Sequence, residues 1–368
     1  MRVTLLAGPQ SLLAGRRRAC ADKEQRVPDK HLVELGTDRG RGNLLGAQPF
    51  LRPMNYSSGA RFRACMDAVL DAAAARGWLR PDTLVLFPEH IGTFLAAADG
   101  KPSMYTAPTL SACGRIAALS APAQYLRALL RSRSADRLTE ALLRMKAAST
   151  ARIYQETFAS LAARRGITIA AGSVALPSPS VKDGRIVCGG GPLYNASFVF
   201  RPDGSLHEIP VLKAYPTSEE LRYIAPGRAA DLPVFETPAG RMGVLICADA
   251  WFPECYARMR KAGARIILTP SFSEEKSWEG SWRGYSGWPN PPDVDSSDIG
   301  KISQQEAVDR YALGGRLPAS GIPSGLMVCF RGEIWGWNVT CGQPVAVLDG
   351  QARTLPSSAG AAVINAWL

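Results

Sequence analysis

Short apolar runs that stop at polar or turn-forming residues recur along the chain and predict buried β-strands. The clearest lie at 83–87, 244–246 and 264–269. Apolar residues at i, i+3, i+4 and i+7 predict an amphipathic helix over 58–76. Further strands are predicted at 43–51, 167–171, 193–200, 205–212, 324–331, 344–348 and 361–366, and further helices from about 154 to Gly166, after 253, and over 304–312.

The order of these elements indicates an α/β protein. Strands alternate with helices in the first half, which favours a largely parallel core. The Arg201–Gly204 turn joins 193–200 to 205–212 as a hairpin, and the late strands add further antiparallel pieces. Two stacked sheets with helices outside and one large mixed sheet both fit this pattern, and periodicity alone leaves the choice open.

Three segments depart from the pattern. Residues 1–40 are rich in Gly and Arg without a sustained period, and are interpreted as a leader or extension of uncertain structure before one domain over 41–368. The segment at about 92–150 has little strand character and predicts a helical insertion. Residues 271–300 read as a long aromatic loop, and Gly189–Gly191 as a flexible connection.

Composition narrows the classes of partner. The net charge is +11, but the Arg residues are scattered without an aromatic-interleaved basic stripe, so a solvated surface is favoured over a nucleic-acid interface. Pro9 and Gln10 interrupt the apolar N-terminus, and no segment has the apolar length to cross a bilayer. We therefore expect a soluble, cytoplasmic protein with no nucleic-acid or membrane partner.

Cysteine and histidine usage argues against a metal site. The chain has eight cysteines, no C-x-x-C pair and three histidines. A zinc or iron–sulfur site needs clustered ligands of these types, so no metal is predicted. The cysteines are expected to be reduced thiols, as in cytosolic proteins.

One cysteine stands where a nucleophile belongs. Cys247 follows the apolar run 244–246, and a turn and a helix come next. The carboxyl edge of a parallel sheet is where open α/β folds place ligands. A thiol attacks a carbonyl only as thiolate, so it needs a base and donors for the oxyanion.

The base and the cation are sought among carboxylates and lysines at strand ends. His207 lies within a strand, His31 in the leader, and only His90 is near a strand end, so no histidine is convincing. Glu89 directly follows one apolar strand and Lys213 directly follows another. Taken singly, either residue is more often a solvated rim residue than a catalytic group.

The ordered set is more specific than its members. Glu89, Lys213 and Cys247, each in its local motif, resemble the Glu-Lys-Cys triad of the nitrilase superfamily of carbon–nitrogen hydrolases, over roughly residues 43–366. The motifs are Phe87-Pro-Glu89, the Tyr194-Asn195 to Pro202-Asp-Gly204 hairpin, Lys213 with Pro216, Thr217 and Glu220, and Ile246-Cys-Ala-Asp249 with Phe252-Pro-Glu254.

The resemblance implies an αββα four-layer sandwich of two mixed sheets with flanking helices, a homodimer or higher homo-oligomer, and no metal or organic cofactor. It implies that Glu89 is the base, that Cys247 forms a thioester, and that Lys213 with the backbone N–H of Ala248 stabilises the oxyanion. Glu220 would orient Lys213 or help to position substrate.

The resemblance also favours one class of substrate over others. Family members specialised for nitriles carry Trp-Glu after the nucleophile, whereas this chain has Ala248-Asp249. The departure favours hydrolysis of a small linear amide or carbamoyl compound. A nitrile hydrolase, an amide-forming acyltransferase and a catalytically silent interaction module remain alternatives. Asp249 and Glu254 also fit a simpler role as caps of the following helix, and the aromatics at 278–288 fit loop packing.

Overall fold

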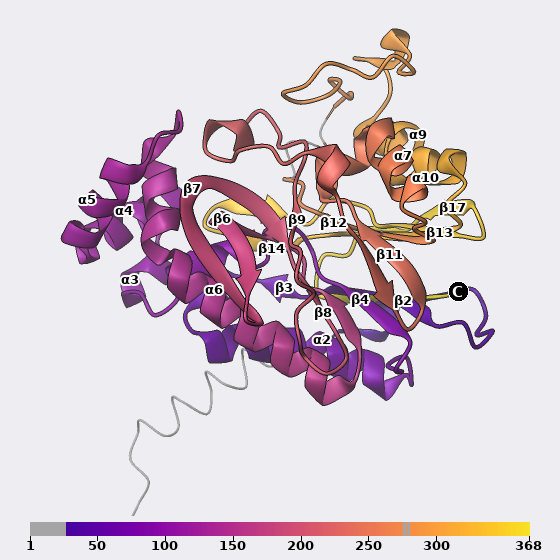
Figure 1. Ribbon diagram of the computed structural model, residues 1–368, viewed down its shortest axis with the longest axis horizontal. Coiled ribbons are helices and arrows are strands. Elements are labelled where there is room, and N and C mark those ends of the chain that lie inside the picture. The colour runs from indigo at the N-terminus through magenta and orange to yellow at the C-terminus, as the bar shows by residue number, and fades with distance from the viewer. Residues whose placement is uncertain (1–26, 275–277, 279) are drawn as a thin grey trace, which may run out of the picture.

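Two mixed six-stranded sheets form the centre of the computed structural model, which describes residues 27–274, 278 and 280–368 (Figure 1). In spatial order the first sheet contains β1 (Leu32–Leu35), β18 (Ala362–Trp367), β2 (Asn43–Gln48), β4 (Thr83–Leu86), β5 (Thr168–Ala170) and β8 (Val199–Phe200). The second contains β10 (Val234–Thr237), β11 (Gly240–Val244), β12 (Ile266–Ser271), β13 (Ser324–Cys329), β16 (Val345–Leu348) and β17 (Gln351–Thr354).

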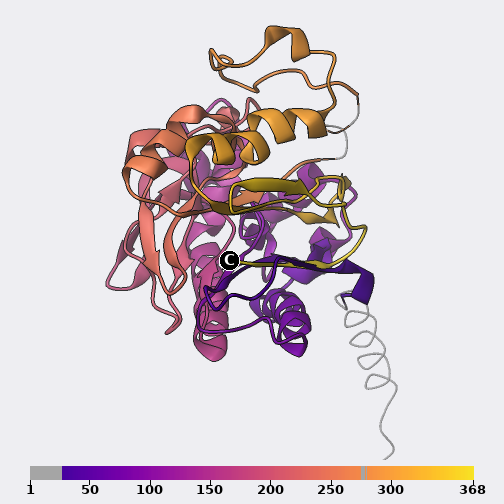
Figure 2. The ribbon, with the colours of Figure 1, turned by 90° about the vertical axis from the view of Figure 1, so that its right-hand side faces the viewer.

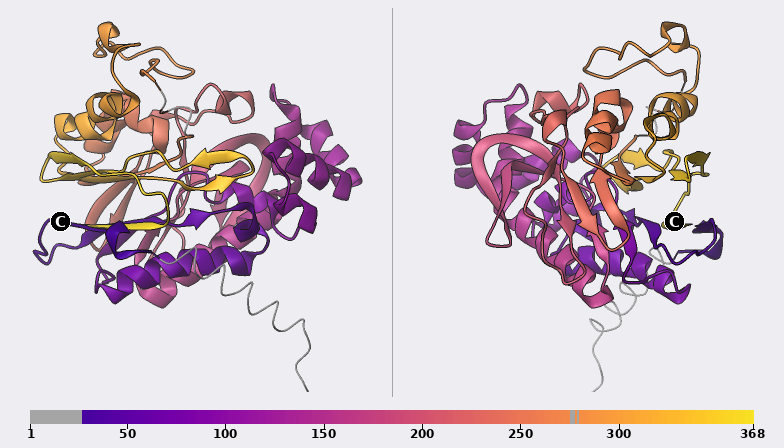
Figure 3. Two further views of the ribbon diagram at one scale, coloured as in Figure 1. Left: turned by 180° about the vertical axis from the view of Figure 1, so that it is seen from behind. Right: turned by 45° about the vertical axis from the view of Figure 1, so that its right-hand side comes forward.

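The two sheets stack face to face between two layers of helices (Figure 2). A Cβ atom on Gly46 of β2 would lie 2.6 Å from Cγ1 of Val328 in β13, so this close approach of the sheets requires glycine. Seen from behind in Figure 3, α2 (Gly59–Ala75) and α6 (Arg137–Arg165) cover the first sheet. The second sheet is covered by α7 (Pro253–Lys261), α9 (Gln304–Tyr311) and α10 (Leu313–Ser320). The predicted αββα sandwich is confirmed, and a single large sheet is excluded.

The parallel core follows the predicted strands except at β11, which runs over Gly240–Val244 and ends where the predicted strand at 244–246 begins. Strands β2, β4 and β5 pair in parallel, as do β11, β12 and β13. In both groups consecutive strands therefore end at the same edge. The predicted helix over 58–76 is α2, whose N-cap Ser58 accepts a hydrogen bond from the Arg61 N–H at 3.3 Å. Its predicted apolar face is buried.

One predicted helix is longer than expected. Instead of starting near 154, α6 runs unbroken from Arg137, where the Asp136 side chain caps it, to Arg165. It ends as predicted at Gly166, which adopts φ 63°. The preceding segment holds α3 (Pro102–Tyr105), α4 (Leu110–Ser120) and α5 (Pro122–Arg131). No helix in the described part of the chain is long and apolar enough to cross a membrane.

The antiparallel pieces differ most from expectation. The long hairpin of β6 (Val174–Lys182) and β7 (Arg185–Ser197) was not predicted, and Gly189–Gly191 lie inside β7 rather than in a flexible connection. Of the strand predicted over 205–212, only an isolated bridge at Leu206 and the short strand β9 (Val211–Leu212) are present. Strand β9 pairs with β7. Prolines within β6 and glycines within β7 hide these strands, because both residue types disfavour regular ladders.

The sheet begins earlier than the sequence indicated. Residues 32–35, assigned to the leader, form β1 and pair in parallel with β18. Leader residues 1–26 lie outside the described residues. A small third sheet of β15 (Trp337–Val339), β14 (Arg331–Ile334) and β3 (Phe50–Leu51) and a fourth of β6, β7 and β9 complete the fold.

Candidate active site

Three strand ends deliver the three predicted residues to one place. Glu89 follows β4, Lys213 follows β9 and Cys247 follows β11. The Lys213 ammonium donates a hydrogen bond to Glu89 Oε1 at 2.7 Å, and the two side chains are 1% and 2% exposed. The charges of both residues act on the pKa of Cys247. Glu89 and Lys213 therefore meet directly, and Cys247 lies near enough for both charges to act on its thiol.

Lys213 is held between two carboxylates. Its Nζ also lies 2.5 Å from Oε2 of Glu220, which starts the short 3-10 helix η4 (Glu220–Arg222). Burial opposes the charge of Lys213, but Glu220 and Glu89 together outweigh burial and raise its pKa above the usual range. Burial likewise opposes the charge of Glu220, and Lys213 and His90 outweigh it and lower the pKa of that carboxyl. The site thus holds a permanent ammonium between two acidic side chains.

Asn195 of β7 joins the two carboxylates from a third direction. Its Nδ2 donates at 2.9 Å to Glu89 Oε1 and at 2.9 Å to Glu220 Oε1. The Asn195 carbonyl accepts the Lys213 N–H at 2.9 Å, so the same residue fixes the lysine backbone. Sequence reasoning placed Asn195 only in a hairpin motif, and its buried position in β7 is a tertiary feature that no local spacing reveals.

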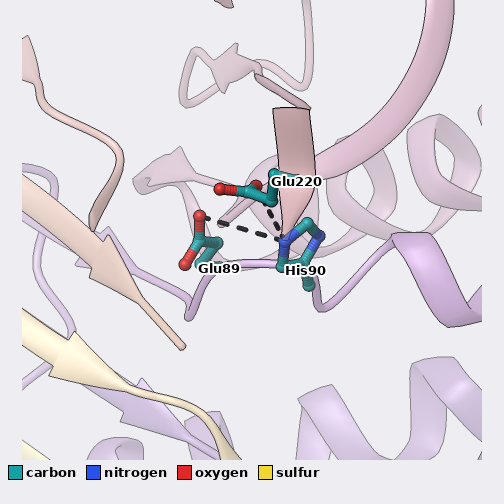
Figure 4. Close-up of side chains that lie close together, drawn as sticks. All are labelled: Glu89, His90 and Glu220. Atoms are coloured by element: carbon teal, nitrogen blue, oxygen red, sulfur yellow. Dashed lines mark ion pairs between the residues drawn. The ribbon is translucent and has the colours of Figure 1, made fainter. Parts of the chain in front are cut away.

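His90 completes the carboxylate cluster. Figure 4 shows its imidazole facing the carboxylates of Glu89 and Glu220, and its Nε2 lies 3.2 Å from Glu220 Oε1. The residue adopts φ 57°, and its N–H donates to Ser173 Oγ at 2.8 Å. No histidine is a convincing base from the sequence alone, although the position of His90 next to Glu89 is a usable signal.

The same cluster could in principle bind a cation. Ligand atoms of Glu89, His90 and Glu220 all lie within 4.8 Å of one another. The Lys213 ammonium, however, already bonds to both carboxylates and carries the positive charge that a metal would bring. Like charges this close in a buried site repel strongly. The arrangement is suited to proton transfer and oxyanion binding more than to metal binding.

Cys247 occupies a sharp turn. It adopts φ 48°, an uncommon conformation for a residue other than glycine, and starts the 3-10 helix η6 (Cys247–Trp251). Its Sγ lies 3.9 Å from the Phe272 carbonyl oxygen. Burial raises the pKa of the Cys247 thiol, Glu89 raises it further, and Lys213 opposes them. The resting group is therefore a thiol that needs a base.

The residue after the nucleophile offers a backbone donor. Ala248 is the second residue of η6, and the first N–H groups of a helix have no partner within that helix. An oxyanion formed beside Cys247 would need such a donor in addition to a cation.

Asp249 links two of the strand ends. The buried carboxylate accepts the N–H groups of Ala214 and Tyr215 at 2.9 and 2.8 Å through Oδ1, and that of Ile246 at 3.1 Å through Oδ2. It thereby ties the segment after Lys213 to the turn that presents Cys247. Burial outweighs Lys213 and these hydrogen bonds and raises the pKa of Asp249 to about 7.

The helix-cap interpretation of Asp249 was therefore wrong for the helix it named. Helix α7 begins at Pro253, and Asp249 instead caps the shorter η6 before it. Glu254 does lie in the first turn of α7, where it accepts a hydrogen bond from the Tyr215 hydroxyl at 2.5 Å. For the site, the important contacts of Asp249 are those with the N–H groups of Ala214 and Tyr215. They join segments more than thirty residues apart, so local spacing in the sequence does not predict them.

Aromatic side chains pack beside the site and the segments next to it. The Phe272 ring meets the His90 ring edge to face at 5.7 Å. In the long loop, Trp282 is buried and stacks on Trp251 at 5.9 Å, and the Trp288 Nε1–H donates to the Pro216 carbonyl at 2.7 Å. The described part of this loop therefore packs against the segments that carry Cys247 and Lys213.

The chain matches a family model described as carbon-nitrogen hydrolase over residues 132–290. It is similar to a probable hydrolase, YhcX, of Bacillus subtilis, at 31% identity over 23% of this chain and 16% of the relative. It is also similar to a citrullinase of Francisella tularensis, at 30% identity over 35% of this chain and 40% of the relative. An N-carbamoylputrescine amidase of Solanum lycopersicum matches at 29% identity over 38% of this chain and 51% of the relative. The chain thus spans about half or less of the length of these relatives.

Solved structures match over far more of the chain. A mutant amidase from Nesterenkonia sp. AN1 in complex with acrylamide superposes with a TM-score of 0.53, covering 90% of this chain and 92% of that chain at 17% identity. At this identity the likeness concerns the fold. The carbon-nitrogen hydrolase model matches residues 132–290, and the superposition shows that the chain has the fold of this amidase.

Proposed function

We propose that this protein hydrolyses a non-peptide C–N bond of a linear amide or carbamoyl compound through a thioester on Cys247, and releases ammonia or an amine. The observation that carries the proposal is the buried Lys213 ammonium, bonded to both Glu89 and Glu220 beside a thiol at a positive-φ turn. Few other chemistries require a base, a fixed cation and a sulfur nucleophile together.

The first half-reaction forms the thioester. Glu89 accepts the proton of Cys247 as the sulfur attacks the carbonyl carbon. The Lys213 ammonium and the Ala248 N–H bind the oxyanion, and Glu89 then returns the proton to the leaving nitrogen. Because the pKa of the Cys247 thiol is raised, this transfer is the step at which the base is needed.

The second half-reaction releases the acid. Glu89 takes a proton from water, which attacks the thioester, and the tetrahedral intermediate is again stabilised by Lys213 and Ala248. Glu220 acts as a positioning residue, because it bonds Lys213 and contacts His90. A removed base or oxyanion donor typically costs about 10²- to 10⁴-fold in rate.

The substrate class rests on the residues after the nucleophile and on two relatives. Ala248-Asp249 replaces the Trp-Glu of nitrile-specialised members, and Asp249 is fully occupied by three backbone N–H groups. Relatives named for citrulline and for N-carbamoylputrescine support a carbamoyl group. A cytoplasmic location and a homodimer or higher homo-oligomer remain predictions, and light scattering of the purified chain would test the assembly.

The test is ammonia release over a panel of short amides, ureido compounds and nitriles, paired with intact-mass detection of an acyl adduct. We expect turnover of amides or ureido compounds, an adduct on Cys247, and loss of both in Cys247→Ala. Cys255→Ala, eight positions away on α7, is the matched control and should keep both. Turnover confined to nitriles would favour a nitrile hydrolase, and amide formation with added amines an acyltransferase. No turnover and no adduct would favour a silent interaction module.

A further inference from the structure

Four of the five most exposed large apolar side chains among the described residues lie in one stretch of the chain, away from the candidate site. Leu119, Leu130 and Leu138 are 79%, 72% and 61% exposed, and Leu126 is 56% exposed. All four lie between residues 119 and 138, in and beside helix α5, at the left edge of Figure 1. Apolar groups gathered on a surface usually mark an interaction site, whereas scattered ones do not.

Helix α5 carries apolar residues on its exposed side as well as on its buried side. Its inner side buries Ala128, with Leu129 half-buried beside it. On its outer side Leu126 and Leu130 are one turn apart and form an apolar stripe, and Arg127 and Arg131 form a parallel basic stripe next to it. The exposed half of the helix thus presents leucine and arginine side by side.

The helix is held firmly in this orientation. Buried Glu140 accepts the N–H groups of Arg133 and Ser134, both at 2.8 Å, and fixes the turn between α5 and α6. The Arg137 guanidinium donates to the carbonyl oxygens of Ser132 at 3.1 Å and Leu129 at 3.2 Å, which caps the end of α5. The outer face is therefore preorganised.

The positive charge on this face is not neutralised. Asp136 is the one acidic residue between positions 102 and 138, and its carboxylate is used by the N–H and hydroxyl of Thr139 at 3.1 and 2.9 Å. Neither Arg127 nor Arg131 has an ion pair within the described residues, whereas Arg164 of α6 pairs with Asp67 at 2.7 Å. The guanidinium groups of Arg127 and Arg131 are therefore available to bind an anion from outside the chain.

We infer that the outer face of α5 is a peripheral binding site for an anionic lipid membrane, lying in the plane of the interface. Leu126 and Leu130 would enter the boundary between headgroups and acyl chains while Arg127 and Arg131 bind lipid phosphates. A contact between the α5 helices of two copies of the chain would oppose arginine with arginine, so charge complementarity disfavours that pairing. This mode needs no spanning helix, and it revises our expectation of no membrane partner. It is independent of the proposed hydrolysis.

The test is sedimentation of the full chain with vesicles of phosphatidylcholine alone or with about 30% phosphatidylglycerol, at low and high salt. We expect binding only to the anionic vesicles and its loss at high salt. Arg127→Gln/Arg131→Gln should weaken binding about thirty-fold, since each basic residue near a charged surface contributes about a factor of five. Leu126→Gln/Leu130→Gln should weaken it as well, and both pairs should retain amide turnover.

Matched controls lie elsewhere on the surface. Lys182→Gln/Arg185→Gln removes two exposed cations at the β6–β7 turn, and Ile209→Gln removes an exposed apolar side chain. Both should bind as the unmodified chain does. The inference is overturned if no vesicle is bound, if neutral vesicles bind equally, or if the α5 variants bind unchanged. Capture by polyglutamate without binding to vesicles would also overturn it, in favour of an acidic protein partner.

Discussion

The carboxylate–lysine cluster and the outer face of α5 treat charge in opposite ways. In the cluster, Lys213 is 1% exposed and bonds to both Glu89 and Glu220. On α5, Arg127 and Arg131 are exposed and have no ion pair within the described residues. Burying an ion without a partner costs several kcal/mol, whereas an exposed arginine keeps its hydration. Charge is thus paired where it must stay fixed and unpaired where it can bind something external.

This contrast has an energetic consequence. Removing one partner of the buried cluster leaves an uncompensated charge in a low dielectric, so chemistry and stability should suffer together. Removing an arginine from α5 leaves nothing unpaired, so only external binding should suffer. A substitution in the buried cluster that left stability unchanged, or one on α5 that lowered it, would show that the two regions depend on charge pairing in a similar way.

The largest expected effect is on turnover. Glu89→Gln keeps the shape of the side chain but removes the proposed base, and should lower kcat/KM about 10²- to 10⁴-fold. Because the Glu89 charge also raises the pKa of Cys247, the variant should lower that pKa. We would treat the variant and the unmodified chain with iodoacetamide over a range of pH and measure the alkylation of Cys247 by mass spectrometry. Alkylation of the variant should begin at a lower pH. Glu208→Gln, an exposed control, should change neither, and unaltered turnover in Glu89→Gln would remove Glu89 from the mechanism.

The next effect is on stability. Glu220→Gln breaks a buried ion pair and should lower the free energy of unfolding by about 3–5 kcal/mol, measured by urea denaturation. Glu156→Gln breaks an exposed pair with Arg152 at 3.0 Å and should cost about 1 kcal/mol or less. Equal losses in the two variants would contradict the distinction between buried and exposed charge.

How much of this was visible in the sequence depends on the range of the interaction. Strand ends made Glu89, Lys213 and Cys247 candidates, and the resemblance of their local motifs to those of the nitrilase superfamily selected them as a set. Asn195 and the backbone contacts of Asp249 were missed, since they join segments far apart along the chain, and His90 was set aside although it directly follows Glu89. In the fold, regular parallel strands were predicted well, whereas β6 and β7 were hidden by proline and glycine. Hydrophobic periodicity and local motifs thus predict regular elements and residues next to them, but not contacts between distant segments.

A smaller effect concerns pH. The pKa of Asp249 is raised to about 7 in the folded protein, above its ordinary value of 3.8. A raised carboxyl pKa means that the folded state binds the proton more tightly, so stability falls as pH rises from about 4 to about 7, by at most about 1.4 kcal/mol per pH unit. Asp249→Asn cannot titrate. The advantage of the unmodified chain over this variant in unfolding free energy should therefore shrink across that window. An advantage that stays nearly constant from about pH 4 to about pH 7 would contradict the raised pKa, and would mean that the three N–H donors keep the carboxylate ionised.

The smallest expected effect belongs to α5. Arg127→Gln/Arg131→Gln should change the free energy of unfolding by no more than about 0.5 kcal/mol, because neither guanidinium has an ion pair to lose in the described structure. Arg144→Gln is the comparison on the neighbouring helix. That side chain donates to Glu140 Oε1 at 2.7 Å and to the Gly191 carbonyl at 2.7 Å, so its loss leaves a buried carboxylate short of a partner and should be clearly destabilising. Thermal and urea unfolding of the two variants side by side would measure the difference. A large loss in the α5 double variant would show that its arginines serve the fold, and the basic stripe would then be structural.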